Sequence, residues 1–173
     1  MTIARTTLKP NQQKMESVSC MKSQYINPLL ESTINVLTTM AMVEVTAGKP
    51  SIKTSNENLG DITSIIDLSG GVNHGSLAIS FTENAILDIT QKMLGETFES
   101  IDETVVDAVG EITNMITGGA KRLYSERDLE FDLTRPSTVV GRDKPVIHTV
   151  KGTTILMPFT TSAGAFYLEV CFN

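Results

Sequence analysis

The stretch Ile101–Arg122, IDETVVDAVGEITNMITGGAKR, predicts an amphipathic helix around which the other segments of the chain can be arranged. At roughly 100° per residue its apolar positions share one face. Together with Leu123, which directly follows the quoted stretch, they are Val105, Val109, Ile112, Ile116, Gly119 and Leu123. A stripe about 80° wide holds polar and small residues on the opposite face, namely Asp107, Glu111, Asn114, Gly118 and Lys121. Glu111 and Asn114 are three residues apart, so their side chains leave the helix as neighbours.

Three glycines lie in this helix, at positions 110, 118 and 119, and each costs about 1 kcal/mol relative to alanine in a helix interior. We expect them to permit a close approach of another element or of a partner. Packing against the first helix of the chain is the expected role of Gly119. For Gly118, packing and partner contact are equally supported.

The polar stripe has limited chemistry by itself. A carboxylate beside a carboxamide offers a charge and a group that orients water, but neither a nucleophile nor a tuned base. Without further information, the residues favour an ordinary solvated surface.

Family resemblance changes this interpretation. The pattern of Asp107, Glu111 and Asn114, followed by Met115 and the glycine pair 118–119, resembles the signature of the CheC/CheX/FliM group of bacterial chemotaxis proteins. A later segment, TILMPFTTSAGAFYLEV at residues 154–170, is similar to the terminal hairpin of the CheX branch.

The resemblance implies a phosphatase that hydrolyses the aspartyl phosphate of a CheY-type response regulator in bacterial chemotaxis or related two-component signalling. Asn114 would hold a water in line with the P–O bond, and Glu111 would anchor the helix by pairing with a lysine of the receiver domain. Gly118 would let the backbone of the partner approach. Asp107 would either contact the partner at the edge of the docking surface or place a favourable charge near the helix N-terminus, and we prefer the second role.

The same resemblance implies that Mg²⁺ arrives with the carboxylates of the receiver, so that the chain needs no cofactor or metal of its own. Two other functions stay open. A FliM-like scaffold module would dock a response regulator without catalysis, but it has no need of the amide. An unrelated enzyme could use Glu111 as an acid or base, but no nucleophile–base pair or metal cluster accompanies that residue.

The fold class predicted from the whole chain is α+β (mixed α/β), with a largely antiparallel sheet and long helices on one side. Residues 1–24 show no consistent period and predict a loosely ordered N-terminal arm, followed by a single CheX-like domain over residues 25–173. Helices are expected from about Asn27-Pro28 to Gly48 and from residue 85 to 94. Strands are expected at residues 51–54, 61–68, 75–81, 130–140, 145–150, 154–160 and 165–172, with a turn at Gly70-Gly71.

An internal duplication of about 80 residues, with pseudo-twofold symmetry, is suggested by the order of the elements. Setting Glu31 against Glu111 places Ile34 against Asn114. The first helix therefore keeps the carboxylate but lacks the amide, and a single active site is expected, as in CheX-like proteins.

Composition limits the partners. The chain has 173 residues with 40% hydrophobic and 20% charged residues, which is typical of one globular domain, and its formal net charge is −6. That charge argues against a nucleic-acid surface and against binding to anionic lipid. The sequence contains no apolar run of about 18 residues, so no membrane span is predicted, and no signal peptide is recognisable. With two cysteines, expected as reduced thiols, and no zinc-ligand spacing, the predicted location is the cytoplasm.

The oligomeric state is predicted from the last two strands, 154–160 and 165–172. Both are apolar, and Glu169 is the one charge in them, so we expect them to be sheet edges that invite pairing. CheX-like proteins are homodimers with sheet contributions from both subunits. We therefore expect a symmetric homodimer with both central helices exposed.

Overall fold

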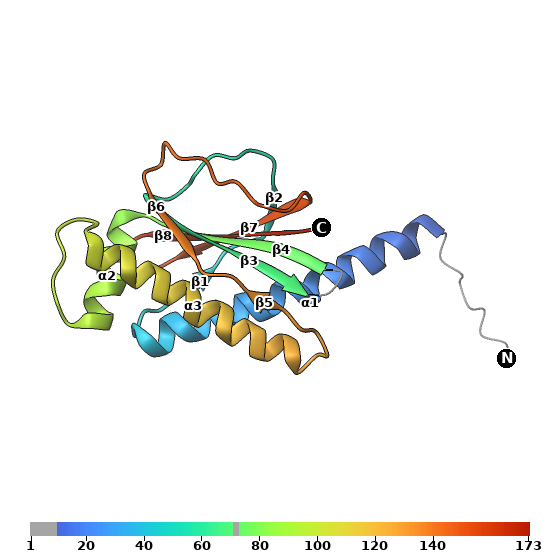
Figure 1. The fold of residues 1–173 in the computed structure, drawn as a ribbon, viewed down its shortest axis with the longest axis horizontal. Coiled ribbons are helices and arrows are strands. Elements are labelled where there is room, and N and C mark those ends of the chain that lie inside the picture. The colour runs from blue at the N-terminus through green and yellow to red at the C-terminus, as the bar shows by residue number, and fades with distance from the viewer. Residues whose placement is uncertain (1–9, 71–72) are drawn as a thin grey trace.

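The structure is a computed structural model that describes residues 10–70 and 73–173. These residues form three helices and one eight-stranded sheet (Figure 1). In chain order the elements are α1 (Pro10–Met40), β1 (Thr46–Ala47), β2 (Ser51–Lys53), β3 (Ile62–Gly70), β4 (Asn73–Phe81), α2 (Glu83–Leu94), α3 (Glu103–Ser125), β5 (Asp132–Leu133), β6 (Ser137–Val140), β7 (Thr153–Thr160) and β8 (Ala165–Phe172).

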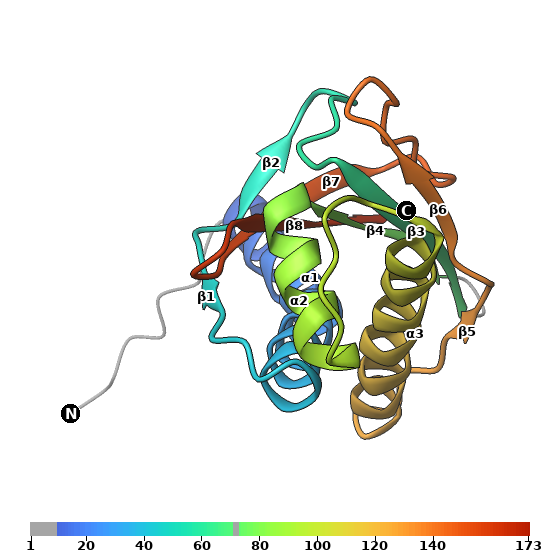
Figure 2. The same cartoon turned by 90° about the vertical axis from the view of Figure 1, so that its left-hand side faces the viewer.

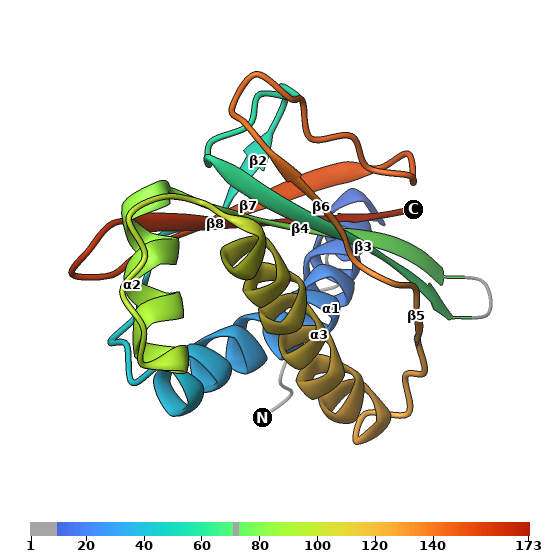
Figure 3. The same ribbon diagram turned by 60° about the vertical axis from the view of Figure 1, so that its left-hand side comes forward.

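All strand pairs in the described sheet are antiparallel, and the order is β1-β7-β8-β4-β3-β5. Strand β2 also pairs with β7, and β6 also pairs with β3. The three helices cover one face of the sheet (Figures 2 and 3). The order is symmetric about its centre, because short strands of each half of the chain pair with the long hairpin of the other half. The predicted fold class and its internal twofold are confirmed.

The core lies between the sheet and the helices. Alternate residues of the central strands point to the helices and are fully buried, among them Ile62, Ile66, Leu77, Ile79, Phe166 and Leu168. The predicted apolar face of α3 meets them, since Val105, Val109, Ile112 and Ile116 are all 0% exposed. Alternation in the strands and a period near 3.6 in the helix thus bury complementary faces. No helix in the described part of the chain is long and apolar enough to cross a membrane.

Helix α1 extends further toward the N-terminus than predicted. It begins at Pro10 and contains Pro28 in its interior, so the predicted start near Asn27 is wrong. Residues 10–26 are rich in Ser, Lys and Gln, and their few apolar residues give only a weak helical period, which is why the sequence does not reveal this part of the helix. Residues 1–9 of the predicted arm lie outside the described residues, and the division of the chain at residue 24 stays a prediction.

The end of α1 also differs from the prediction, which placed it at Gly48. The helix ends at Met40, and the backbone N–H of Val43 donates to the carbonyl of Leu37 at 3.2 Å. Met42 takes a positive φ of 50°, so this turn is closed without glycine.

The strand predicted at residues 145–150 is instead part of a loop, 141–152, that joins β6 to β7. Val146 in this loop is buried, and its N–H donates to the carbonyl of Asn56 at 3.0 Å. The loop therefore packs on another loop through Val146, while its neighbour Ile147 is 64% exposed. The predicted strand 130–140 is divided into the short strands β5 and β6, and of the predicted Gly70-Gly71 turn, Gly71 lies outside the described residues.

The two terminal strands form the predicted hairpin, but they are not the edges of the sheet. β8 pairs with β7 on one side and with β4 on the other, and β1 and β2 pair with the outer side of β7. The expectation that 154–160 and 165–172 are exposed edges is therefore wrong. Short strands form the edges of the described sheet, as is usual for an exposed edge.

A buried ionic cluster lies on the face of the sheet opposite the helices. Glu169 is 1% exposed, and its carboxylate accepts a hydrogen bond from the Lys53 ammonium at 2.6 Å. That ammonium, whose side chain is 6% exposed, also donates to the carbonyl of Glu57. His148 Nε2 lies 3.6 Å from the other carboxylate oxygen. Glu169 is therefore an interior charge with a partner, and not the edge guard that the sequence suggested.

Candidate active site on helix α3

The predicted polar stripe is exposed along its whole length. Asp107, Glu111, Asn114, Gly118 and Lys121 are all exposed, while the residues between them are mostly buried. Helical geometry places the β-carbons of Glu111 and Asn114 about 5–6 Å apart. The structure thus brings the predicted catalytic pair together on one accessible surface.

The side chains of this pair are free to meet a partner. Among the described residues, no hydrogen bond or ion pair engages the side chain of Asp107, Glu111 or Asn114. A carboxylate and a carboxamide that make no hydrogen bonds within the protein are free to form them with the groups of another molecule.

The backbone beneath the stripe is held firmly. Asp102 caps α3 by accepting a hydrogen bond from the Val105 N–H at 2.9 Å. Near the other end, the buried Tyr124 hydroxyl donates to the carbonyl of Tyr25 in α1, and burial raises the pKa of Tyr124 so that the hydroxyl stays a neutral donor. A helix anchored at both ends keeps Glu111 and Asn114 in fixed relative positions.

The two adjacent glycines of α3 have different surroundings. A β-carbon on Gly119 would lie 2.2 Å from Ser32 Oγ of α1, and that hydroxyl donates to the Ile116 carbonyl at 2.7 Å. Gly119 therefore permits the contact between the helices, which confirms its predicted packing role. A β-carbon on Gly118 would meet nothing within 4 Å, so the fold itself does not require a glycine there.

Asp107 lies in the second turn of α3, because the helix begins at Glu103. The effect of the helix dipole falls off within the first turn, where Asp102 and Glu103 already supply negative charge. This geometry favours a contact at the edge of the docking surface over the dipole role that we preferred from the sequence. At the other end of the stripe, Lys121 lies 3.5 Å from Asp132 in an exposed ion pair.

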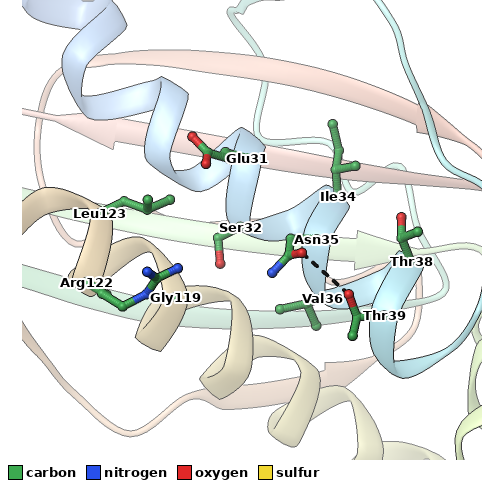
Figure 4. A pocket seen from close by; sticks show the side chains of 10 residues that line it. All are labelled: Glu31, Ser32, Ile34, Asn35, Val36, Thr38, Thr39, Gly119, Arg122 and Leu123. Atoms are coloured by element: carbon green, nitrogen blue, oxygen red, sulfur yellow. Dashed lines mark hydrogen bonds between the residues drawn. The ribbon is translucent and has the colours of Figure 1, made fainter.

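A groove that the sequence did not reveal lies beside the stripe, between α1 and α3 (Figure 4). Its volume is about 390 Å³. The lining residues are Glu31, Ser32, Ile34, Asn35, Val36, Thr38, Thr39, Gly119, Arg122 and Leu123. The groove depends on two helices whose sequences are 80 residues apart, so only the small residues Ser32 and Gly119 could have indicated the close contact.

Comparison with known proteins places the chain in a family. A family model described as "Chemotaxis phosphatase CheX" matches residues 62–160, which is more than half of the chain and includes all of α3. The curated "CheY-P phosphatase CheX" of Thermotoga maritima is 29% identical over 124 residues, which are 71% of this chain and 79% of that protein.

Two solved structures agree. The chemotaxis protein CheX from Vibrio vulnificus is 42% identical, with a TM-score of 0.82, and the match covers 87% of this chain and 99% of that one. A CheX–CheY–BeF₃–Mg²⁺ complex from Borrelia burgdorferi has a chain that is 24% identical, with a TM-score of 0.72, and the match covers 86% of this chain and 97% of that chain, a likeness that shows the fold. From its sequence match and its fold, the chain belongs to the CheX family of chemotaxis phosphatases.

Proposed function

We propose that the exposed stripe of α3 is where this CheX-family phosphatase hydrolyses the aspartyl phosphate of a CheY-type response regulator. The observation that carries the proposal is the pair Glu111 and Asn114, which is exposed, unpaired within the described residues and fixed on a helix that packs on the core. In the Borrelia burgdorferi structure a CheX and a CheY form one complex, which supports a receiver domain as the partner.

The proposed chemistry needs little from the enzyme. An aspartyl phosphate is a reactive acyl phosphate, and phosphoryl transfer depends chiefly on positioning and charge stabilisation. The Asn114 carbonyl accepts a hydrogen bond from the attacking water, and its NH₂ group donates to a phosphoryl oxygen. The water oxygen forms the new bond to phosphorus as the bond to the aspartyl oxygen breaks. Inorganic phosphate and a free aspartate are the products, and the proton of the water leaves with phosphate or to solvent.

Glu111 is the anchor in this proposal. Its carboxylate pairs with a lysine of the receiver beside the phosphorylation site, and docking excludes water from the contact. Such a charge-assisted hydrogen bond is stronger than an exposed surface pair. Asp107, one turn before Glu111, contacts the partner at the edge of the same surface.

Magnesium belongs to the partner in this proposal. The Borrelia burgdorferi complex contains Mg²⁺ together with CheY and BeF₃. We propose that the carboxylates of the receiver hold the ion here as well. In the part of this chain that the structure describes, no three His, Cys, Asp or Glu side chains form a group that could hold a metal. Three expectations stay predictions: the protein has no resident cofactor, it binds neither nucleic acid nor membranes, and it is located in the cytoplasm.

The function is tested by incubating the protein with a panel of phosphorylated receiver domains and Mg²⁺. We expect release of inorganic phosphate from at least one receiver to exceed the rate of its own autodephosphorylation by an order of magnitude or more. If no receiver from the same cell is dephosphorylated faster in the presence of the protein, the proposed function is wrong.

Gly118→Ala is expected to separate stability from docking. Its β-carbon meets nothing in the free protein, so the substitution should stabilise the fold by about 1 kcal/mol, through helix propensity. The same methyl group would stand where the partner's backbone comes close, so KM for the phosphorylated receiver should rise severalfold. Urea unfolding and phosphate release measure the two effects.

Gly110→Ala is the matched control for this variant. A β-carbon at Gly110 also meets nothing within 4 Å, and the residue lies outside the stripe. It should give the same gain in stability with an unchanged KM. Equal KM values for the two alanine variants would remove the proposed role of Gly118.

We also propose that the protein is a homodimer, although the terminal strands are not the edges that the sequence suggested. Within the described sheet β2 pairs only with β7, and Ile52 in β2 is 67% exposed. An edge strand with an exposed apolar side chain is suited to pairing with a second copy. Sedimentation equilibrium at micromolar concentration should give twice the monomer mass, and a monomer would remove the dimer while leaving the active site unaffected.

A further inference from the structure

We propose that the groove between α1 and α3 is part of the receiver-docking surface and that Glu31 and Arg122 on its two walls select which receiver binds. This inference rests on the proposed function and extends it from chemistry to partner choice. The occupant is the receiver domain whose phosphoryl group lies at Asn114.

The groove has a mostly apolar floor and charged walls. Ser32, Val36 and Leu123 are buried at its base, where Gly119 allows the helices to approach. On the α1 side stands the exposed carboxylate of Glu31, and on the α3 side stands Arg122, whose side chain is 70% exposed. In Figure 4 Glu31 on α1 and Arg122 on α3 lie on opposite sides of the groove. Its one ion pair among the described residues is a surface contact with Glu126 at 3.3 Å, which a partner can replace at little cost.

The groove continues the proposed catalytic surface without a break. Arg122 follows Gly118 by four residues, so the two are neighbours on the same helix face. Glu111, Gly118 and Arg122 lie within about 40° of one another around α3, and Arg122 is about 12 Å beyond Asn114 along the axis. A body that contacts Glu111 and passes over Gly118 therefore arrives at the groove.

The size of a protein interface requires contacts beyond the stripe. A stable interface buries about 800 Å² on each partner and involves some 20–30 residues a side. The stripe on α3 has five residues, so a bound receiver must also contact a flanking element. The opposite flank has a cavity of about 290 Å³ beside β5, but there Lys121 is engaged with Asp132, and Glu111 lies on the side of the stripe nearer to α1. The α1 flank is therefore the better extension.

The chemistry of the walls describes the segment that fits. A receiver loop or helix end would place a lysine or arginine opposite Glu31 and a carboxylate or carbonyl opposite Arg122, with a small apolar side chain over the floor. The internal duplication agrees with this role. Glu31 is the counterpart of Glu111, while Ile34 stands where a water-positioning amide would be needed. The α1 surface thus keeps a docking carboxylate and lacks the catalytic group.

The test compares two charge reversals, Glu31→Lys and Arg122→Glu, in steady-state phosphate release from the phosphorylated receiver. Neither residue is part of the proposed catalytic machinery. We expect KM to rise about tenfold in each variant, with kcat within twofold of the parent. Calorimetric titration with the BeF₃-activated receiver should show the same loss of affinity. Because this binding measurement does not depend on turnover, it tests the groove even if no receiver proves to be a substrate.

Lys144→Glu is the matched control for Arg122→Glu, since it makes the same change of charge at an exposed position of the 141–152 loop, which joins β6 to β7. It should leave KM and affinity unchanged. The proposal is overturned if both groove variants bind the activated receiver as tightly as the parent, or if Lys144→Glu weakens binding as much as they do. A change of sedimentation with unchanged receiver affinity would also overturn it, because the groove would then hold a second copy of the chain.

Discussion

Asn114→Ala is expected to lower kcat for receiver dephosphorylation about a hundredfold or more, with little change in KM or in folding stability. The substitution removes the one group that both accepts from the attacking water and donates to the phosphoryl oxygen. Removing a comparable polar group that stabilises a transition state in other enzymes costs about 10²–10³ in kcat. Asn114 is exposed and its side chain makes no hydrogen bond within the described residues, so the fold loses nothing. Phosphate release with the enzyme in excess over the phosphorylated receiver measures the chemical step directly.

Two comparison variants make this result specific. Glu111→Ala should raise KM more than it lowers kcat, because it removes a docking contact. Asn84→Ala changes an exposed asparagine on α2 and should have no effect on either constant. Full turnover by Asn114→Ala on every receiver that the parent dephosphorylates would show that the water is positioned by another group.

Glu169→Ala is expected to lower the free energy of unfolding by about 3–5 kcal/mol. The change leaves the Lys53 ammonium buried without its charged partner, and removing one member of a buried pair is strongly destabilising. The cost is large compared with the total stability of a domain, which is typically about 5–15 kcal/mol. Urea unfolding followed by circular dichroism gives the value directly.

The double variant Lys53→Met/Glu169→Leu distinguishes this charge effect from a loss of packing. It removes both charges and replaces them with apolar side chains, so it should be much more stable than Glu169→Ala. The exposed pair of Arg142 and Asp61, at 2.7 Å, is the control, and Arg142→Ala should cost no more than about 1 kcal/mol. A double variant as unstable as the single one would mean that the cluster is not held together by charge.

The comparison of sequence and structure separates local patterns from long-range ones. The face of α3 was predictable because the period of 3.6 runs through the whole helix without interruption. The terminal hairpin was predictable from two apolar runs separated by Ser162-Ala163-Gly164. Both features depend on residues that are close in the sequence.

Features that depend on distant residues were not predictable in the same way. The sequence did not indicate that Glu169 is buried, because its partner, Lys53, is 116 residues away in β2. One signal was present in the sequence, since Leu168, Val170 and Cys171 around it make β8 apolar on both faces, as in a strand that is covered on both sides. For Gly118 the sequence left packing and partner contact open, and only the position of Ser32, beside Gly119 and not beside Gly118, showed that the fold does not need a glycine at 118.

The site was predictable in its residues but not in its extent. Periodicity placed Glu111 and Asn114 on one accessible face, and the family resemblance gave them their roles. The groove beside them is formed together with α1. In the sequence, α1 showed only one of the two motif residues, because Glu31 matches Glu111 but Ile34 stands in place of Asn114. A linear sequence does not show which side of a helix contacts a neighbouring element, so the extent of the site could be described only from the structure.

The place of β8 in the sheet has a consequence for how the chain matures on the ribosome. This strand, Ala165–Phe172, is hydrogen-bonded to β4 and β7, yet it is synthesised after every other described strand. Before β8 is available, β3 and β4 form a hairpin that lacks its inner neighbour, and β7 has no link to it. The nascent chain therefore exposes an unpaired strand edge until β8 has left the ribosome and inserted between β4 and β7. Release of a prematurely terminated chain would yield a species prone to aggregation, and not a smaller folded domain.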